Sequence, residues 1–492
     1  MANFLIDSTA ANPKTVGAIQ QLLDSDAVHD GDIIVLKGTF SQTDTQFLRL
    51  SKSVTLRGDT SGGATLLGGK QLEWGRAPDG IGIQPIAATM ENITLRHFTI
   101  GGIQMMGAKG ENVIRNCRFE DYRYGEKPGK KGAWPIVGGN AGVSGALTIT
   151  GCHFGAPSAA SVPPAGLNNL IHLNNCDLDT LTITNNVIED MHWVGIAVWG
   201  VSGQTVISGN TITKKSSFGG FGAGISFGAT PDGYVLKREG SALIEGNTVN
   251  IEVDDSCGII ACQYPDQQYK SGAPGAPRAI TVRDNVINMK SANNNRAALA
   301  CIGGCSGSSW TNNRVTGVAR YGILVTQDTQ AADLTKSDAP PVNDTFEGND
   351  LTEFKASQAQ IFVDEAAAHI ALRGNTLGPV LGSNKTLWPP PLENPRAGIA
   401  YYGSLGHIVS NDFAQSDIPG WIGGSGNRHV GCIYLGQVSR ANAVEYSESD
   451  FPNGTGHPQH RQILDEDVWE GKSANKAPPD ANTILELAPI PR

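Results

Sequence analysis

One short segment of the chain gathers the residue types that acid–base chemistry requires. Glu189 and Asp190 are followed closely by His192 and Trp193. Because a neighbouring carboxylate orients an imidazole ring and stabilises its charged form, such a histidine can exchange a proton near neutral pH. His172 joins this group, since the repeat described below places it one coil earlier. We interpret Asp190, His172 and His192 as candidate catalytic residues, against the plainer interpretation of solvated surface groups.

Other residues are suited to hold a ligand. Trp199 and Tyr402 offer flat aromatic surfaces that stack on a sugar ring or an apolar ligand. An equally good interpretation of Trp199 is that it only covers a neighbouring loop. Arg320 and Tyr321 are adjacent and can bind or polarise an oxygen atom. Asn174 completes this predicted substrate-binding set as a polar residue on the outer side of its strand.

Carboxylates are scattered near the same strands. Asp254 and Asp255 precede one strand, and Asp328 and Asp364 lie near two others. Glycosidases use two carboxylates that flank the scissile bond. We therefore include Asp254 and Asp255 among the candidate catalytic residues and Asp328 and Asp364 among the substrate-binding ones. A solvated turn is the plainer interpretation of the Asp254–Asp255 pair.

A short phrase recurs along the chain and defines the elements that must position these residues. The phrase is apolar-x-apolar-x-small-Asn-x-apolar, and residues 183–188 and 207–212 are two examples of its last six positions. The smallest spacing of the Asn anchors is about two dozen residues, and longer spacings indicate loop insertions. The anchors are Asn186, Asn210, Asn247, Asn285, Asn313, Asn349, Asn375 and Asn411.

The repeat predicts short strands that stack in parallel, because an isolated strand of this length cannot bury its inner face. We expect the Asn to occupy the bend between two strands, where the left-handed conformation suits it and its amide can bond to the next Asn. Cys117 and Cys152 occupy the same place and are interpreted as small inward fillers.

A second set of strands should follow the bends and carry the candidate residues. Alternation assigns one isoleucine of each strand to an inner row, and a shift of one residue would reverse every side chain. The predicted inner row is Ile171, Ile196, Ile225, Ile259, Ile323, Ile361 and Ile399. The predicted outer positions are His172, Asn174, Ala197, Trp199, Ser226, Ile260, Cys262, Leu324, Thr326, Phe362, Asp364 and Tyr402.

The start of the chain adds to this pattern. Residues 14–23 form an amphipathic pattern with Val16, Ile19, Leu22 and Leu23 on one face, and strand-like segments follow at 31–40 and 54–58. This order, together with the repeat, resembles the pectin-lyase-like superfamily over residues 4–436. The resemblance implies an all-β, single-stranded, right-handed parallel β-helix of about ten or more coils. We expect a helical cap and first strand in 1–40, the β-helix in 41–438, and an irregular C-terminal cap and tail in 439–492.

In the enzymes of this superfamily, an external groove beside the second set of strands holds the substrate. Polyuronate lyases of this fold carry an acidic calcium cluster there, which the matching positions here lack. Cys257 and Cys262, like Cys301 and Cys305, are not spaced as a tight Cys-x2-Cys zinc motif. We therefore expect neither a metal nor a cofactor.

Composition excludes some partners. The formal net charge is -10, and no Lys/Arg cluster is present, which argues against nucleic acid. No apolar run is long enough to span a membrane, and the start lacks a signal-peptide pattern, so we expect a cytoplasmic protein. Oligomerisation is left open.

Three functions fit these features. A carbohydrate-active enzyme, acting as a lyase, hydrolase or epimerase on an oligosaccharide in the groove, is preferred because of the resemblance and the candidate residues. The apolar outer positions favour instead an isomerase or cyclase that acts on a small hydrophobic biosynthetic intermediate. A non-catalytic stack of the tailspike type is the third interpretation, since fold alone does not determine function.

Overall fold

The computed structural model forms two compact units, Met1–Ala242 and Leu243–Arg492, which are described separately. The described residues are 1–42, 48–60, 63–68, 81–83, 86–97, 101–105, 107–121, 134–139, 143–155, 169–191, 193–215, 222–228, 240–253, 256–262, 279–292, 294, 296–303, 307–327, 340–364, 366–381, 397–401, 403, 407–409, 411 and 421–422.

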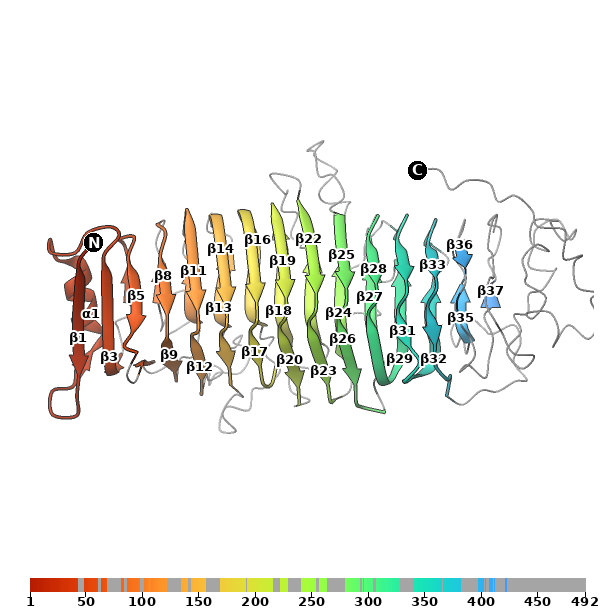
Figure 1. Ribbon diagram of the computed structural model, residues 1–492, viewed down its shortest axis with the longest axis horizontal. Coiled ribbons are helices and arrows are strands. Elements are labelled where there is room, and N and C mark those ends of the chain that lie inside the picture. Colours follow the sequence, from red (N-terminus) through yellow and green to blue (C-terminus); the bar gives the residue numbers. More distant parts are fainter. Residues whose placement is uncertain are drawn as a thin grey trace, which may run out of the picture. The chain divides into compact units, whose positions relative to one another are not determined.

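The first unit is a stack of short parallel strands with one helix (Figure 1). Strands of successive coils pair in register, so each coil lies on the one before it. The elements are β1 (Asn3–Ser8), β2 (Lys14–Thr15), α1 (Val16–Asp24), β3 (Ile33–Ser41), β4 (Leu48–Leu50), β5 (Thr55–Gly58), β6 (Ala64–Leu67), β7 (Ile81–Ile83), β8 (Thr89–Glu91), β9 (Ile93–Arg96), β10 (Gly101–Met105), β11 (Glu111–Arg115), β12 (Arg118–Glu120), β13 (Trp134–Gly139), β14 (Ser144–Thr150), β15 (His153–Phe154), β16 (Asn169–Thr184), β17 (Val187–Ile188), β18 (Val194–Val201), β19 (Gln204–Ser208), β20 (Thr211–Lys214) and β21 (Gly222–Gly228).

The second unit repeats the arrangement without a helix among its described residues. Strand β22 (Ser241–Glu245) contains the boundary between the units. The others are β23 (Thr248–Ile251), β24 (Ser256–Cys262), β25 (Ala279–Arg283), β26 (Val286–Met289), β27 (Ala297–Ile302), β28 (Ser309–Thr311), β29 (Arg314–Thr326), β30 (Thr345–Glu347), β31 (Asp350–Leu351), β32 (Phe354–Val363), β33 (Ala371–Arg373), β34 (Thr376–Leu377), β35 (Ala397–Tyr401), β36 (His407–Val409) and β37 (Trp421–Ile422).

A coil therefore consists of three strands separated by bends, and the chain is a parallel β-helix. In the first unit β18, β19 and β20 make one coil, and each pairs in parallel with a strand, or part of one, in the preceding coil. In the second unit β24, β25 and β26 pair in the same way with β27, β28 and β29. The fold expected from the repeat is confirmed.

The core is a set of aligned rows of apolar side chains. Ile171, Ile196 and Ile225 are register partners in the first unit and are fully buried. The same holds in the second unit for Ile259, Leu299, Ile323, Ile361 and Ile399. Full burial of such a side chain contributes roughly 1.5–3 kcal/mol. The predicted inner row is confirmed within each unit, and Leu299 belongs to β27, a strand that the predicted second set did not include.

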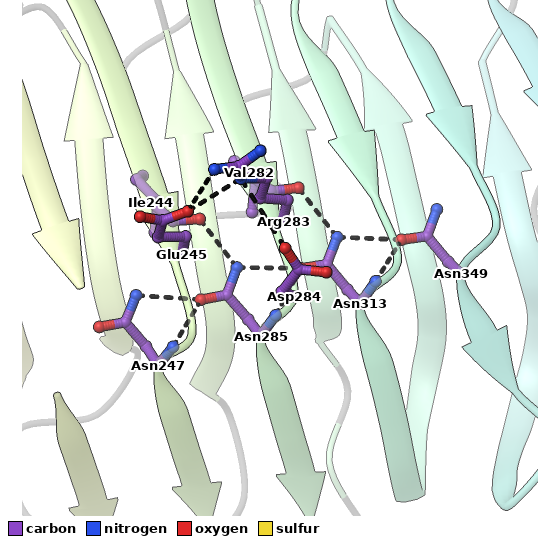
Figure 2. A network of polar contacts seen from close by, with 9 residues as sticks. All are labelled: Ile244, Glu245, Asn247, Val282, Arg283, Asp284, Asn285, Asn313 and Asn349. Atoms are coloured by element: carbon purple, nitrogen blue, oxygen red, sulfur yellow. Dashed lines mark hydrogen bonds and ion pairs between the residues drawn. The ribbon is translucent and has the colours of Figure 1, made fainter. Parts of the chain in front are cut away.

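In the second unit, four of the Asn anchors form a hydrogen-bonded ladder at one bend, namely Asn247, Asn285, Asn313 and Asn349 (Figure 2). Asn285 Nδ2 donates to Asn313 Oδ1 at 2.9 Å, and Asn313 Nδ2 donates to Asn349 Oδ1 at 2.9 Å. Each amide also donates to a carbonyl of a preceding coil, as Asn285 Nδ2 does to Ile244 O at 3.0 Å. These side chains are fully buried, so the ladder satisfies polar groups that water does not reach.

The left-handed residue of this bend is not the ladder Asn, which corrects the prediction. Positive φ angles occur one position earlier, at Asn185 (55°), Asp284 (55°) and Asn312 (54°). The sharp turn is made by that preceding residue, and this leaves the ladder side chain pointing inward toward its neighbours. Asn, Asp and Gly share the preceding position because they tolerate this conformation.

The ladder position is occupied by cysteine in two earlier coils. Cys117 and Cys152 are buried, and the Cys152 backbone N–H donates to Asn186 Oδ1 at 2.9 Å. The pKa of the Cys152 thiol is raised well above its usual range. The adjacent Cys117 is the largest cause, and burial of the thiol is the second. Both residues are small, buried fillers of the bend, as their place in the repeat predicted.

The N-terminal segment differs in detail from the expectation. The helix α1 spans Val16–Asp24, and it buries Val16, Ile19 and Leu23, whereas Leu22 is half-buried. An unpredicted strand, β1, precedes it and pairs in parallel with β3. The capping role of α1 remains a prediction, and the predicted tail 439–492 lies outside the described residues.

Candidate functional site

The outer side of β16, β18 and β21 carries the densest set of candidate residues in the first unit. Registers align His172 with Ala197 and Ser226, and Asn174 with Trp199. These positions alternate with the buried isoleucine row, so their side chains face away from it. We call this surface the Trp199 face and define it by Asn169, His172, Asn174, Trp193, Trp199 and Ser226.

Trp199 is the centre of this face. Its half-buried ring meets the His172 ring edge to face, with centroids 5.3 Å apart, and meets Trp193 in the same manner at 5.7 Å. Trp199 Nε1 donates to Ser226 Oγ at 2.9 Å. Ring contacts of this geometry and the indole hydrogen bond fix the orientation of the ring. The face therefore presents a positioned aromatic surface.

Two amide oxygens on the Trp199 face are buried and have no protein donor. They are Asn169 Oδ1 and Asn174 Oδ1. The other amide atom of Asn169, Nδ2, lies 2.5 Å from His172 Nδ1. A buried acceptor without a donor costs about 1–3 kcal/mol, so these two oxygens lower the stability of the fold locally.

The carboxylates next to this face bind other groups. Asp190 is buried, and its Oδ1 accepts a hydrogen bond from the Lys215 backbone N–H at 2.8 Å. Glu189 Oε1 lies 2.9 Å from His153 Nε2 on the neighbouring coil. Asp190 thus takes part in holding a turn. His192, the predicted partner of Asp190, lies outside the described residues.

The second unit brings together Arg320 and Tyr321, as the sequence suggested. Arg320 Cζ lies 5.1 Å from the centre of the Tyr321 ring. Both side chains donate to Gln358 Oε1, Arg320 Nε at 2.6 Å and Tyr321 Oη at 2.7 Å. The Tyr321 ring also packs at 5.2 Å from that of Phe362, and burial raises the pKa of its hydroxyl. The cluster is well packed, and Gln358 joins its two members.

Asp364 stabilises a turn at the end of β32. Its Oδ2 accepts hydrogen bonds from the Thr326 hydroxyl and, at 2.6 Å, from the Gln327 backbone N–H. Its Oδ1 accepts from the backbone N–H groups of Ala366 and Ala367 at 3.0 and 3.2 Å. Burial raises the pKa of Asp364, although these hydrogen bonds oppose the shift.

The remaining predicted site residues cannot be placed. Asp254, Asp255, Asp328 and Tyr402 lie outside the described residues, as His192 does. Among the described residues, no group of three or more His, Cys, Asp or Glu side chains is arranged to hold a metal ion. No helix in the described part of the chain is long and apolar enough to cross a membrane.

Sequence reasoning missed Asn169 and Gln358 as partners of candidate residues. Strict alternation assigns Asn169 to the inner side of β16, yet its amide contacts His172 at the start of that strand. Gln358 lies 38 residues from Arg320 and meets it only because the two coils stack. Ser226 was predicted on the outer row, but nothing in the sequence indicated its bond to Trp199.

The outer row is apolar and buried, although it faces away from the core. Ala197 is fully buried in the first unit, and Ile260, Leu324 and Phe362 are at most 7% exposed in the second. Alternation alone predicted such apolar side chains. His172, Asn174 and Trp199 differ from them in being partly exposed, as Asp364 also is in the second unit.

No known protein-family profile matches the chain, and no curated protein sequence matches it. Some solved structures have a distantly similar fold. A tailspike protein of E. coli bacteriophage HK620, in complex with a pentasaccharide, is 12% identical with a TM-score of 0.46, covering 83% of this chain and 74% of its own. A PL6 alginate lyase in complex with a trisaccharide is 12% identical with a TM-score of 0.42, covering 90% and 88%. A mannuronic acid specific polysaccharide family 6 lyase from human gut microbiota is 15% identical with a TM-score of 0.38, covering 89% and 92%. Likeness of this degree identifies neither a reaction nor a substrate for this chain.

Proposed function

We propose that the chain is a carbohydrate-active protein that binds an oligosaccharide on the Trp199 face. The observation that carries the proposal is the partly exposed Trp199 ring, held by three neighbours, beside the partly exposed Asn174. A sugar ring has an apolar C–H face that stacks on an indole, and its hydroxyls form hydrogen bonds with amide groups. Asn174 and Trp199 are register partners, so one sugar residue can contact both side chains.

We infer that the enzyme class is a lyase, hydrolase or epimerase, with His172 as the proton-exchanging group. His172 contacts Trp199 directly, and histidine is the side chain that most often transfers protons in catalysis. Asp190 is proposed to support the adjacent turn, since its carboxylate accepts from Lys215 N–H. The isomerase or cyclase reading and the non-catalytic reading are alternative outcomes of the experiment below.

The test is a calorimetric titration of the full chain with a panel of neutral and uronic oligosaccharides. Trp199→Ala removes the stacking surface and Asn174→Ala removes the amide group beside it. Each is expected to weaken binding at least about tenfold, since tenfold corresponds to about 1.4 kcal/mol. Asn288→Ala is the matched control for Asn174→Ala, because Asn288 is a partly buried Asn of the second unit.

The outcomes separate the three functions. Glycan binding lost in Trp199→Ala and kept in Asn288→Ala supports the proposal. Binding of polycyclic apolar compounds without glycans would instead favour the isomerase or cyclase function. Absence of binding to either class would contradict the proposal and leave a structural role. Product analysis after incubation with a bound glycan then distinguishes conversion from binding alone.

A further inference from the structure

Cys117 and Cys152 occupy the same ladder position in two successive coils of the first unit. The residues that follow them, Arg118 and His153, are register partners in β12 and β15. The His153 backbone N–H also donates to Cys117 O at 2.8 Å, as expected between adjacent parallel strands. Cys117 and Cys152 therefore lie opposite one another, and the spacing of such strands places their α-carbons about 4.8 Å apart.

The two thiols point in the same direction, into the interior of the coil. Cys117 Sγ lies 3.5 Å from Arg115 O, and Cys152 Sγ lies 3.6 Å from Thr150 O. Each carbonyl belongs to the residue two positions before its cysteine, so the two side chains have equivalent orientations. Both cysteines are at most 1% exposed, and both are free thiols in the structure. One sulfur therefore lies beside the other, one strand spacing away.

The amide ladder between coils does not extend to this pair. Further along the unit an Asn amide joins one coil to the next, as Asn186 Nδ2 does when it donates to Asn210 Oδ1 at 2.9 Å. The Cys152 backbone N–H still donates to Asn186 Oδ1, at 2.9 Å. Cysteine has no amide group, so Cys152 cannot continue the ladder to Cys117. The bend carries two thiols where a side-chain amide joins the coils elsewhere.

We propose that Cys117 and Cys152 form a disulfide that joins the two coils when the chain folds in the presence of an oxidant. A disulfide needs α-carbons about 4.4–6.8 Å apart, and the spacing of adjacent strands falls within this range. A rotation of the cysteine side chains then brings the two sulfurs to bonding distance. The disulfide supplies a covalent link at the bend where the amide ladder ends.

The oxidant is a low-molecular-weight disulfide, such as oxidised glutathione. One cysteine thiolate attacks it, forms a mixed disulfide and releases the first small thiol. The second cysteine thiolate attacks the mixed disulfide, and the protein disulfide closes as the second small thiol leaves. The two cysteines lose two protons and two electrons, and the reagent takes up both to become two thiols.

The bond has to form before the coils close over the cysteines. The thiolate is the reactive form of cysteine. The neighbouring Cys117, and then burial, raise the pKa of the Cys152 thiol well above its usual range, so the folded chain holds this sulfur as an unreactive thiol. Both sulfurs are also buried away from a reagent in the folded chain, whereas the unfolded chain exposes them. The folded protein is therefore expected to react slowly, and the folding chain to react readily.

The experiment is refolding of the reduced full chain from urea in a buffer that contains reduced and oxidised glutathione. Samples are quenched in acid, which stops thiol exchange, and are mapped by peptic digestion and mass spectrometry without reduction. We expect a peptide pair linked through Cys117 and Cys152 in most of the refolded chain. A chain folded first under reducing conditions and then given the same buffer should contain little of this pair.

Cys257 and Cys301 are the internal control. Both are buried and lie on the paired strands β24 and β27, but the register partner of Cys301 is Ala261, four residues beyond Cys257. Four residues of a strand span about 13 Å, which is too far for a disulfide. A Cys257–Cys301 link as abundant as the Cys117–Cys152 link would mean random pairing and would overturn the proposal.

The disulfide should also raise the urea concentration at the midpoint of unfolding, because it restricts the unfolded chain. Cys152→Ser, refolded in the same buffer, should show no such rise relative to its reduced form. A refolded wild-type chain in which both thiols remain free would contradict the proposal, as would a linked chain that unfolds at no higher urea concentration than the reduced one. The wild-type peptide map alone decides if Cys152→Ser fails to fold.

Discussion

At the scale of single residues, Asp344 shows how the interior of a coil changes the chemistry of one side chain. Its Oδ1 accepts hydrogen bonds from the Ser308 backbone N–H at 2.8 Å and from the Ser308 hydroxyl at 2.6 Å. Trp310 Nε1 donates to that hydroxyl at 2.7 Å, whereas Asp344 Oδ2 is buried without a partner. Burial raises the pKa of Asp344 to about 7, although the hydrogen bonds oppose the shift.

The raised pKa makes stability depend on pH. Between the unfolded value of 3.8 and the folded value of about 7, the unfolded carboxyl is ionised while the folded one keeps its proton. The contribution of the protonated Asp344 carboxyl to the free energy of unfolding is therefore fully present below about pH 4. It is lost as the pH rises toward 7, and the loss is at most roughly 4 kcal/mol. We expect Asp344→Asn, which stays neutral, to gain stability relative to wild type over this range.

Urea unfolding at several pH values between 4 and 8 measures that gain. Asp284→Asn, which replaces an exposed carboxyl on the same unit, is the control and should show no comparable pH-dependent gain. A difference between Asp344→Asn and wild type that stays constant from pH 4 to 8 would contradict a buried protonated carboxyl.

At the scale of residues, the sequence predicted where candidate side chains lie along the strands better than it predicted which groups they bind. Asp190 and Glu189 were correctly seen as neighbours of the predicted strand, but Asp190 binds a backbone N–H and Glu189 lies beside His153. These partners are 25 and 36 residues away. Because inserted loops vary in length between coils, linear spacing does not reveal which side chains stack on one another.

At the scale of elements, the Asn ladder holds successive coils in register. Asn313 illustrates the cost of removing one member. It accepts from the Asn285 side chain at 2.9 Å and backbone at 3.2 Å, and it donates to Val282 O and Asn349 Oδ1 at 3.0 and 2.9 Å. Figure 2 shows these groups in one continuous chain of hydrogen bonds.

We expect Asn313→Ala to lower the free energy of unfolding by more than about 3 kcal/mol. The change leaves several buried donors and acceptors unpaired, at roughly 1–3 kcal/mol for each group. Chemical denaturation followed by circular dichroism gives the value. Asn288→Ala serves as the comparison, since Asn288 bonds to Asn250 and Thr316 only on the partly exposed outer side of its strand.

The Asn288→Ala change should cost about 1 kcal/mol or less. Equal losses in the two variants would mean that the ladder adds nothing beyond an ordinary surface hydrogen bond. The repeat predicted the ladder members and the inner rows, because alternation and burial follow directly from stacking. The repeat gave the wrong position for the left-handed residue. The repeated phrase shows where Asn recurs, but it does not show which residue of the bend adopts a positive φ angle.

At the scale of the whole molecule, each unit is a parallel β-helix whose coils differ mainly in their connecting loops. The fold could be predicted from the sequence alone because every coil must bury the inner faces of its strands against the next coil. This requirement produces the same apolar pattern in each coil. The Trp199 face was only partly predictable. Trp199, His172 and Asn174 could be assigned to the outer side, whereas their contacts with Trp193, Asn169 and Ser226 depend on side-chain packing between elements.

The central claim is that the Trp199 face binds an oligosaccharide, and a crystal structure of the chain with the tightest-binding glycan tests it most directly. We expect a sugar ring stacked on Trp199 and in contact with the side chains of Asn174 and His172. A glycan bound instead in the second unit, beside Arg320 and Tyr321, would contradict the claim.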